Sequence, residues 1–250
     1  MIEVRYRGGL GDWLFQYAFA RLLASRWHFA MPGLPIPGMP ATGGCMHGRR
    51  LLGPLEVLAG SACELLSSGT LLRPHNLQVP LEARVILHGW FQRVEYLVES
   101  EEHWGAWFRQ EDAYEGDGSL ALCLRMKKPP AWMEPGMHAG QSGPWPGLTP
   151  TAAAVARLLA AVQPRKVAVF SDGLPNPEIS ALLVPFGYTG EWARLDTPGT
   201  LRRLRGFHHI AGSAHHSFEW WAAQLNGRAE AWLHDPYPKD CRSSELTQHR

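Results

Sequence analysis

The sequence predicts an α/β protein built mainly on parallel strands. Strand-like apolar stretches alternate with helix-like stretches throughout the second half of the chain, and such alternation is typical of parallel sheets covered by helices. The N-terminus has the same order, with a short strand, a glycine-rich turn and a long helix. A length of 250 residues with 45% hydrophobic residues is enough for one large folded domain or two small ones.

The first half holds few regular elements. Residues 2–6 alternate apolar and charged side chains, which predicts a strand. A glycine-rich turn leads into a helix over about residues 13–27, for which Asp12 is a good N-cap. A second strand is expected at residues 85–90 and a second helix at residues 97–108.

The second half is more regular. We expect strands at 119–125, 166–170, 188–195, 208–211 and 229–234, and helices at 152–162, 177–184, 200–206 and 218–225. Thr149 can cap the first of these helices, with Pro150 at its first position. Trp220 and Trp221 lie beside small apolar residues on the last helix, so we expect them in the core.

Composition argues against several classes of function. With 24 Lys and Arg against 23 Asp and Glu, the net charge of +1 removes the electrostatic basis for a dedicated nucleic-acid binder. The four cysteines form no CxxC pair, so neither a zinc site nor a redox motif is expected. No apolar run reaches the roughly 18–20 residues that span a bilayer, and the charged start MIEVRYRGG is unlike a signal peptide. We expect a cytoplasmic location, with peripheral membrane association left open.

Three residues with useful chemistry lie at the carboxyl ends of predicted strands or in the segments that follow them, where parallel sheets bind ligands. Arg125 is placed to hold a phosphate bidentately, although a solvated basic loop with Lys127 and Lys128 fits the sequence equally well. Asp172 can accept hydrogen bonds from a nucleobase or ribose, or it can form a turn. Ser217, at a helix start, can bind phosphate through its hydroxyl and its backbone N–H.

The glycine-rich turn before the first helix is a further candidate. Gly9 and Gly11 allow backbone amides to approach a ligand, and the N-terminus of a helix favours anionic groups. A tight turn capped by Asp12 explains the same residues. His215 and His216 lack a third ligand at suitable spacing, so no metal site is expected.

Four stretches of the chain resemble one known family. Residues 8–18 (GGLGDWLFQYA) look like the GGLGNQLFQYA opening of the alpha-1,2-fucosyltransferase family, glycosyltransferase family 11. Residues 88–97 (HGWFQRVEYL) resemble that family's GYFQSEKYF, and residues 169–173 (VFSDG) resemble VFSDD. Residues 208–226, which include HHIA and SFEWWAAQLN, resemble HHIIANSSFSWWAAWLN. The four blocks occur in the family's order and span almost the whole chain.

The resemblance implies a GT-B-like architecture, in which two Rossmann-like halves with mostly parallel sheets enclose a cleft. The N-terminal half, residues 1–115, would face the acceptor, and the C-terminal half, residues 116–250, would bind the nucleotide sugar. The implied reaction is an inverting, metal-independent transfer of fucose from GDP-fucose to a hydroxyl of a glycan acceptor, with no cofactor.

The resemblance also assigns residues to the donor site. Arg125 matches the first Arg of the family's HxRRxD motif, which holds the donor phosphates. Asp172 matches the first Asp of SDD, near guanine or ribose. Ser217 and Phe218 match the Ser-Phe pair that lines the donor site. We also expect Gly9 and Gly11 of the glycine-rich turn to contact the donor.

The chain departs from the family at defining positions. HxRRxD reads CLRMKK over residues 123–128, and the second Asp of SDD is Gly173. The Asn-Gln of the family's opening is Asp12-Trp13. These departures leave two further functions open: a transferase for another nucleotide sugar, and a degenerate, non-catalytic protein that binds a glycan or a nucleotide.

Two residues are the candidates for catalysis. Arg125 would stabilise the leaving diphosphate. Asp12 is the candidate general base, because its carboxylate replaces an amide and should point into the cleft, although a purely structural role at the helix start explains it as well. His88, His215 and His216 are alternative bases, since imidazoles titrate near neutrality.

Overall fold

The computed structural model describes thirteen stretches of the chain. They are residues 2–6, 9–27, 85–87, 91, 101–108, 115–124, 151–171, 173, 177–187, 189–191, 197–212, 217–226 and 232–234. The chain forms two compact units, residues 1–111 with 244–250 and residues 112–243, and each has its own sheet. The assignment of residues 1–115 to the acceptor and of residues 116–250 to the nucleotide stays a prediction.

The first unit contains a short parallel strand pair and one long helix. β1 (Ile2–Val4) pairs with β2 (Val85–Leu87), and Ile2 lies opposite Val85. α1 (Leu10–Trp27) has every side chain of residues 14–20 buried, as in a helix that is surrounded by protein. β1 ends at Val4 although the alternation predicts a strand to residue 6, and the Arg5 N–H donates a hydrogen bond to the Leu87 carbonyl at 3.0 Å.

Arg21 connects α1 to the helix α3 (Glu101–Trp107). Its guanidinium lies 5.3 Å from the ring centroid of Trp107 and 5.7 Å from that of Tyr17. Its Nη1 also donates a hydrogen bond to the Tyr17 hydroxyl at 3.0 Å. A cation between two aromatic rings is a favourable contact at a partly buried position, so Arg21 is a structural residue of this unit.

The second unit is a doubly wound parallel sheet. Its strands are β3 (Ser119–Leu124), β4 (Lys166–Ser171), β5 (Thr189–Glu191), β6 (His209–Ala211) and β7 (Trp232–His234). All neighbours are parallel, in the order β5-β4-β3-β6-β7. The fold class predicted from the sequence, α/β with mostly parallel sheets, is therefore confirmed, whereas the GT-B arrangement of two halves stays a prediction.

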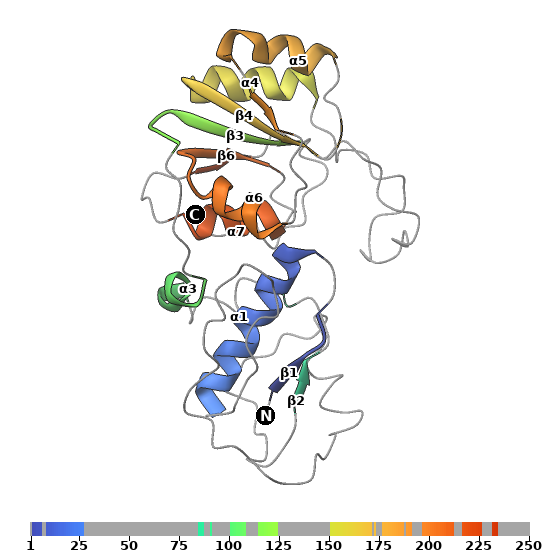
Figure 1. The fold of residues 1–250 in the computed structure, drawn as a ribbon, viewed down its shortest axis with the longest axis vertical. Helices are drawn as coiled ribbons and strands as arrows, with labels where there is room; N and C mark the ends of the chain where they lie inside the picture. Colours follow the sequence, from blue (N-terminus) through green and yellow to red (C-terminus); the bar gives the residue numbers. More distant parts are fainter. Residues whose placement is uncertain are drawn as a thin grey trace. The chain divides into compact units, whose positions relative to one another are not determined.

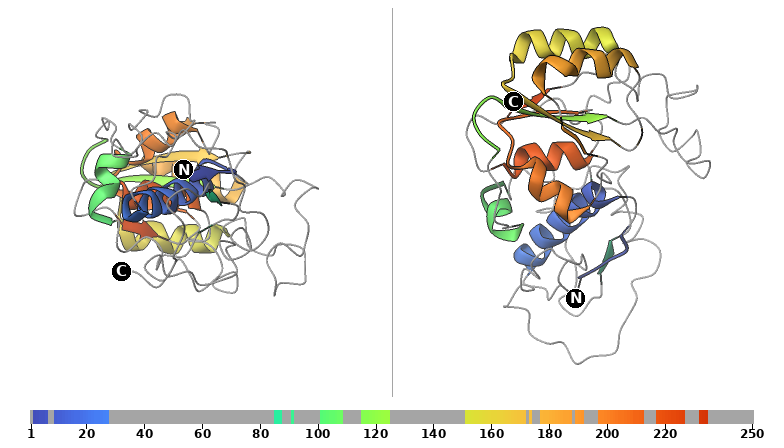
Figure 2. Two further views of the ribbon diagram at one scale, coloured as in Figure 1. Left: turned by 90° about the horizontal axis from the view of Figure 1, so that it is seen from below. Right: turned by 45° about the horizontal axis from the view of Figure 1, so that its top comes forward.

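Helices cover both faces of this sheet. They are α4 (Ala152–Val162), α5 (Pro177–Leu183) with the following 3-10 turn η4 (Val184–Phe186), α6 (Pro198–Leu204) and α7 (Ser217–Gln224). Figures 1 and 2 show α4 and α5 on one face and α6 and α7 on the other. Val155, Leu159 and Ile179 pack with Leu122 and Val169 in the core under α4 and α5.

The cap of α4 differs from the prediction. The helix is capped by Thr151, whose backbone is extended and whose hydroxyl accepts a hydrogen bond from the Ala154 N–H at 3.1 Å. The predicted cap, Thr149, is wrong because Thr151 stands directly before the alanine run and offers the same hydroxyl. Trp220 and Trp221 are 3% and 0% exposed, which confirms that they belong to the core.

Among the residues that the structure describes, no helix combines the length and the apolar character that crossing a membrane requires.

Candidate functional site

The carboxyl ends of the central strands of the second unit meet at one edge of the sheet. Leu124 of β3 lies opposite Ser171 of β4, and Leu122 lies opposite Ala211 of β6. From β3 the chain winds outward through β4 and β5, and it then returns to the other side of β3 for β6 and β7. Parallel sheets bind ligands where the winding direction changes, so the ends of β3 and β6 form the candidate site.

Two predicted site residues lie outside the described residues. Arg125 follows the last residue of β3, and Asp172 follows the last residue of β4. The structure therefore describes the strand ends that precede them but not their side chains. The alternative bases His88, His215 and His216, and the basic Lys127 and Lys128, also lie outside the described residues.

A side-chain turn closes the end of β4. The Ser171 hydroxyl donates to the Gly173 carbonyl and accepts from the Gly173 N–H at 3.2 Å. Such a serine turn holds the backbone that follows a strand, and Ser171 is only 3% exposed. The backbone on both sides of Asp172 is thus held by a buried side chain.

The first turn of α7 carries the next two predicted residues. Ser217 is the first residue of the helix and is partly exposed, which confirms its predicted place at a helix start. Phe218 follows and is 1% exposed, so its ring is buried. Their contact with a donor stays a prediction.

Glu219 is a residue of this edge that sequence reasoning missed. Its side chain is 0% exposed, although carboxylates are rarely buried completely. A Cβ atom placed on Gly212, directly after β6, would lie 2.6 Å from Glu219 Cγ and 3.5 Å from Cys123 Cβ. The available signal was a carboxylate within the apolar stretch SFEWW, where the resembled family has serine.

The glycine-rich turn of the first unit has a different cap from the predicted one. α1 begins at Leu10, and the Gly9 carbonyl accepts a hydrogen bond from the Trp13 N–H at 3.1 Å. Asp12 is therefore not the N-cap but lies in the first turn, where its Oδ2 accepts from the Gly9 N–H at 2.8 Å. The arrangement is half of a capping box, in which a residue of the first turn reaches back to the cap.

This arrangement changes what the turn can offer a ligand. The Gly9 amide already donates to Asp12, so an anion would compete with an internal hydrogen bond. Gly11 is buried inside the first turn of α1. Asp12 is held in one orientation, which is useful for a base that must face a fixed direction.

Tyr6 stands in the sequence between β1 and the glycine-rich turn, and its ring centroid lies 5.4 Å from that of Trp13. Burial raises the pKa of the Tyr6 phenol well above its usual range, and the nearby Tyr17 raises it further. The phenol therefore stays protonated at neutral pH and can donate a hydrogen bond, but it cannot act as a base.

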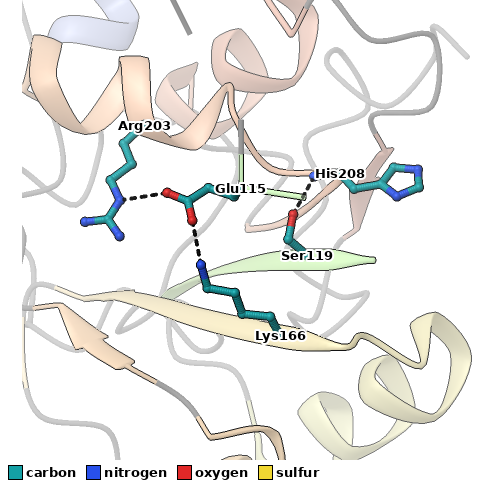
Figure 3. A network of polar contacts seen from close by, with 5 residues as sticks. All are labelled: Glu115, Ser119, Lys166, Arg203 and His208. Atoms are coloured by element: carbon teal, nitrogen blue, oxygen red, sulfur yellow. Dashed lines mark hydrogen bonds and ion pairs between the residues drawn. The ribbon is translucent and has the colours of Figure 1, made fainter. Parts of the chain in front are cut away.

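The amino ends of the strands of the second sheet, opposite the candidate site, carry a polar network, which Figure 3 shows. Glu115 lies 2.7 Å from Lys166 Nζ and 3.5 Å from Arg203 Nε. The backbone N–H of His208 donates to Ser119 Oγ at 3.1 Å, and His208 Nδ1 accepts from the Gly118 N–H at 3.0 Å. Ser119 and Lys166 are the first residues of their strands, so this network stabilises the end of the sheet away from the candidate site.

Within the described stretches, no group of three His, Cys, Asp or Glu side chains is arranged to hold a metal ion. The fold defines an α/β protein whose second unit has the strand order of a doubly wound sheet, and the carboxyl ends of β3 and β6 are the candidate position for a ligand.

Comparison with known proteins gives only weak structural likeness. No model of a known protein family matches the chain, and no curated protein matches it. Among solved structures, the chain is similar to a crystal structure of POFUT1 in complex with GDP, with 14% sequence identity and a TM-score of 0.36. The match covers 61% of this chain and 55% of that one, so the chain spans little more than half of the matched structure. At this TM-score the likeness decides neither the fold nor the function.

Proposed function

We propose that this protein is an inverting, metal-independent glycosyltransferase of the alpha-1,2-fucosyltransferase type, which transfers fucose from GDP-fucose to a hydroxyl of a glycan acceptor. The observation that carries the proposal is the edge between β3 and β6, where the winding of the sheet changes direction. Arg125 follows β3 there, and Ser217 opens α7 after β6. The four sequence blocks that resemble the fucosyltransferase family support the choice of reaction.

The donor diphosphate is the first part of the substrate that this edge has to hold. The Arg125 guanidinium forms two parallel hydrogen bonds to phosphate oxygens, as arginine does with planar anions. The Ser217 hydroxyl and the backbone N–H groups at the start of α7 supply further donors, and the helix dipole favours the negative charge. Asp172 accepts hydrogen bonds from the guanine or the ribose, on a backbone held by Ser171.

The transfer itself is a direct displacement. The acceptor oxygen attacks C1 of fucose while the bond between C1 and the phosphate oxygen breaks, and GDP leaves with the electron pair. Arg125 stabilises the charge that develops on this leaving group. Asp12 takes the proton of the acceptor hydroxyl, with its carboxylate oriented by the Gly9 N–H.

One observation favours a second candidate, a transferase for a different nucleotide sugar. Gly173 stands where the family has its second Asp, and its backbone is engaged by the Ser171 hydroxyl. A glycine supplies no side chain for contacts to the base or the sugar at that point. The identity of the donor therefore needs a direct test.

Calorimetric titration with GDP-fucose, GDP, GDP-mannose and UDP-sugars separates the candidates. We expect heat of binding with GDP-fucose and GDP, together with release of GDP when donor and acceptor glycans are mixed. If the protein binds only another nucleotide sugar, the sugar that it transfers is that one and not fucose. Silence with every nucleotide would contradict the proposal and leave a glycan-binding protein.

Chelation tests the metal-independent part of the mechanism. Turnover should be unchanged in EDTA, because the charge of the diphosphate is neutralised by Arg125 and the start of α7 rather than by a cation. The measurement is the rate of GDP release with and without the chelator. A loss of rate that Mg²⁺ or Mn²⁺ restores would show that the proposed charge stabilisation is wrong.

A further inference from the structure

We infer that Glu219 is a positioning residue of the nucleotide-sugar site and that it acts through Gly212. This inference rests on the proposed function, because the site that Glu219 positions is the donor site between β3 and β6. Gly212 is the first residue after β6, and Glu219 lies in the first turn of α7, two residues after Ser217. The contact between them fixes the start of α7, which carries Ser217, against the end of β6, the strand that pairs with β3.

The contact is too close for any side chain at residue 212. A Cβ atom there would lie 2.6 Å from Glu219 Cγ and 3.0 Å from Glu219 Cβ. Gly212 is not among the described glycines with positive φ, which are Gly116, Gly118 and Gly187. Glycine is therefore required at this position by the close approach of the helix and not by an unusual backbone conformation.

Glu219 determines how closely α7 approaches the end of β6. Its side chain is 0% exposed, so its aliphatic part fills the space beneath Gly212. The Cβ of Cys123 in β3 lies 3.5 Å from the same point, which brings the third element of the edge into the contact. Because interiors are closely packed, a change in the size of this side chain shifts the helix start relative to both strands.

Such a shift acts directly on the donor site. Ser217 and the N–H groups around it move with the first turn of α7 relative to the end of β3, which Arg125 follows in the sequence. The two groups then no longer fit the spacing of one diphosphate, and misplacement of this kind is costly for a site that works by alignment. Glu219 itself lies beneath the site, so it acts through the backbone that it supports.

A double-variant cycle in the GDP affinity tests the inference. Gly212→Ala should weaken GDP binding at least about tenfold, because the new methyl group collides with the Glu219 stem. Adding Glu219→Ala removes Cγ and leaves a Cβ contact of 3.0 Å, so the double variant should bind GDP more tightly than Gly212→Ala does. Glu219→Ala alone should weaken GDP binding, because the helix start loses its support.

Two control variants separate positioning from stability. Gly199→Ala, in α6, adds a methyl group with nothing within 4 Å and should leave the GDP affinity unchanged. Val155→Ala, in the core under α4, should lower the melting temperature without changing the GDP affinity, because it lies on the other face of the sheet. All affinities are measured by calorimetry at a temperature where each variant is fully folded.

Each outcome of the cycle decides the question. A folded Gly212→Ala variant with wild-type GDP affinity overturns the inference, and so does a double variant that binds no better than Gly212→Ala. If Gly212→Ala does not fold, Glu219→Ala decides, and an unchanged GDP affinity overturns the inference. A wild-type protein that binds no nucleotide overturns the proposed function and this inference together, whereas normal wild-type binding with unaffected variants overturns the inference alone.

Discussion

Two neighbouring histidines, His208 and His209, lie where β6 begins, and their surroundings change the pKa of His209. The rings of His208 and His209 stack with centroids 4.5 Å apart. Burial lowers the pKa of His209, and the nearby His208 lowers it further. His208 accepts a hydrogen bond at Nδ1 from the Gly118 N–H, which requires that this nitrogen carries no proton. The surroundings of His209 therefore favour its neutral form in the folded protein.

The protein should therefore lose stability as the solution is acidified through the range of histidine titration. His209 binds a proton less readily in the folded chain than in the unfolded chain, where the pKa of a histidine is about 6.5. Its contribution to stability is fully present above that value and is lost as the pH falls through the lowered pKa of the folded state. Urea unfolding between about pH 7.5 and pH 5.5 measures this loss.

Two variants assign the pH dependence to its source. His209→Gln should reduce the loss of unfolding free energy that occurs as the pH is lowered. His103→Gln, at an exposed position of α3, should leave the fall unchanged. A His209→Gln protein with the full wild-type pH dependence would contradict the assignment.

Helix starts illustrate what sequence can and cannot predict at the scale of an element. Thr-Pro pairs precede both α4 and α6 in the sequence. At α6 the pair works as a cap, because the Thr197 hydroxyl accepts from the Thr200 N–H at 3.1 Å and Pro198 is the first helical residue. At α4 the cap is Thr151 instead. Local chemistry offers several equivalent starts, and the packing of the helix on the sheet selects one of them.

The cap assignment of α4 can be measured. Thr151→Ala should lower the free energy of unfolding by about 1 kcal/mol, because the Ala154 N–H loses its acceptor. Thr149→Ala should change it by less than about 0.5 kcal/mol. Urea unfolding of the two variants makes the comparison, and the reverse order of the two effects would restore the cap predicted from the sequence.

The ion pairs of Figure 3 act between elements. Glu115 joins the start of β4, through Lys166, to the last turn of α6, through Arg203. The hydrogen bond from Lys166 lowers the pKa of Glu115, burial opposes this effect, and Arg203 lowers it further. This stabilisation is present above the pKa of the unfolded carboxyl and is lost as the pH falls through the lowered value.

Glu115→Gln tests this connection. Because Lys166 is 47% exposed, the loss of unfolding free energy at pH 7 should be only about 0.2–1 kcal/mol. The difference between variant and wild type should shrink at high salt, which screens exposed ion pairs. A difference that is the same at low salt and in 1 M salt would show that the loss is not electrostatic.

At the scale of the whole molecule, the second unit separates the candidate site from its stabilising network. The predicted donor residues follow the carboxyl ends of the strands, and the Glu115 network lies at the amino ends. Changes at the amino ends should alter stability without altering nucleotide affinity.

The sequence predicted the alternation of elements and the place of Ser217, because periodicity and capping are local signals. It missed Glu219, because a carboxylate in one apolar stretch acquires its role only through a contact with Gly212 from a different element. It placed Asp12 at the cap, because the ability of Gly9 to take that position depends on the three-dimensional path of the turn. The roles of Arg125 and Asp172 stay predictions.

The affinity of Arg125→Ala for GDP tests the central claim most directly, since the claim is that Arg125 holds the donor diphosphate together with the start of α7. Charge-assisted hydrogen bonds contribute about 1.5–3 kcal/mol, so calorimetry should show binding about 10- to 100-fold weaker than wild type with an unchanged melting temperature. Glu115→Gln, at the opposite edge, is the control and should bind GDP as the wild type does. Wild-type affinity in the Arg125→Ala protein would contradict the account.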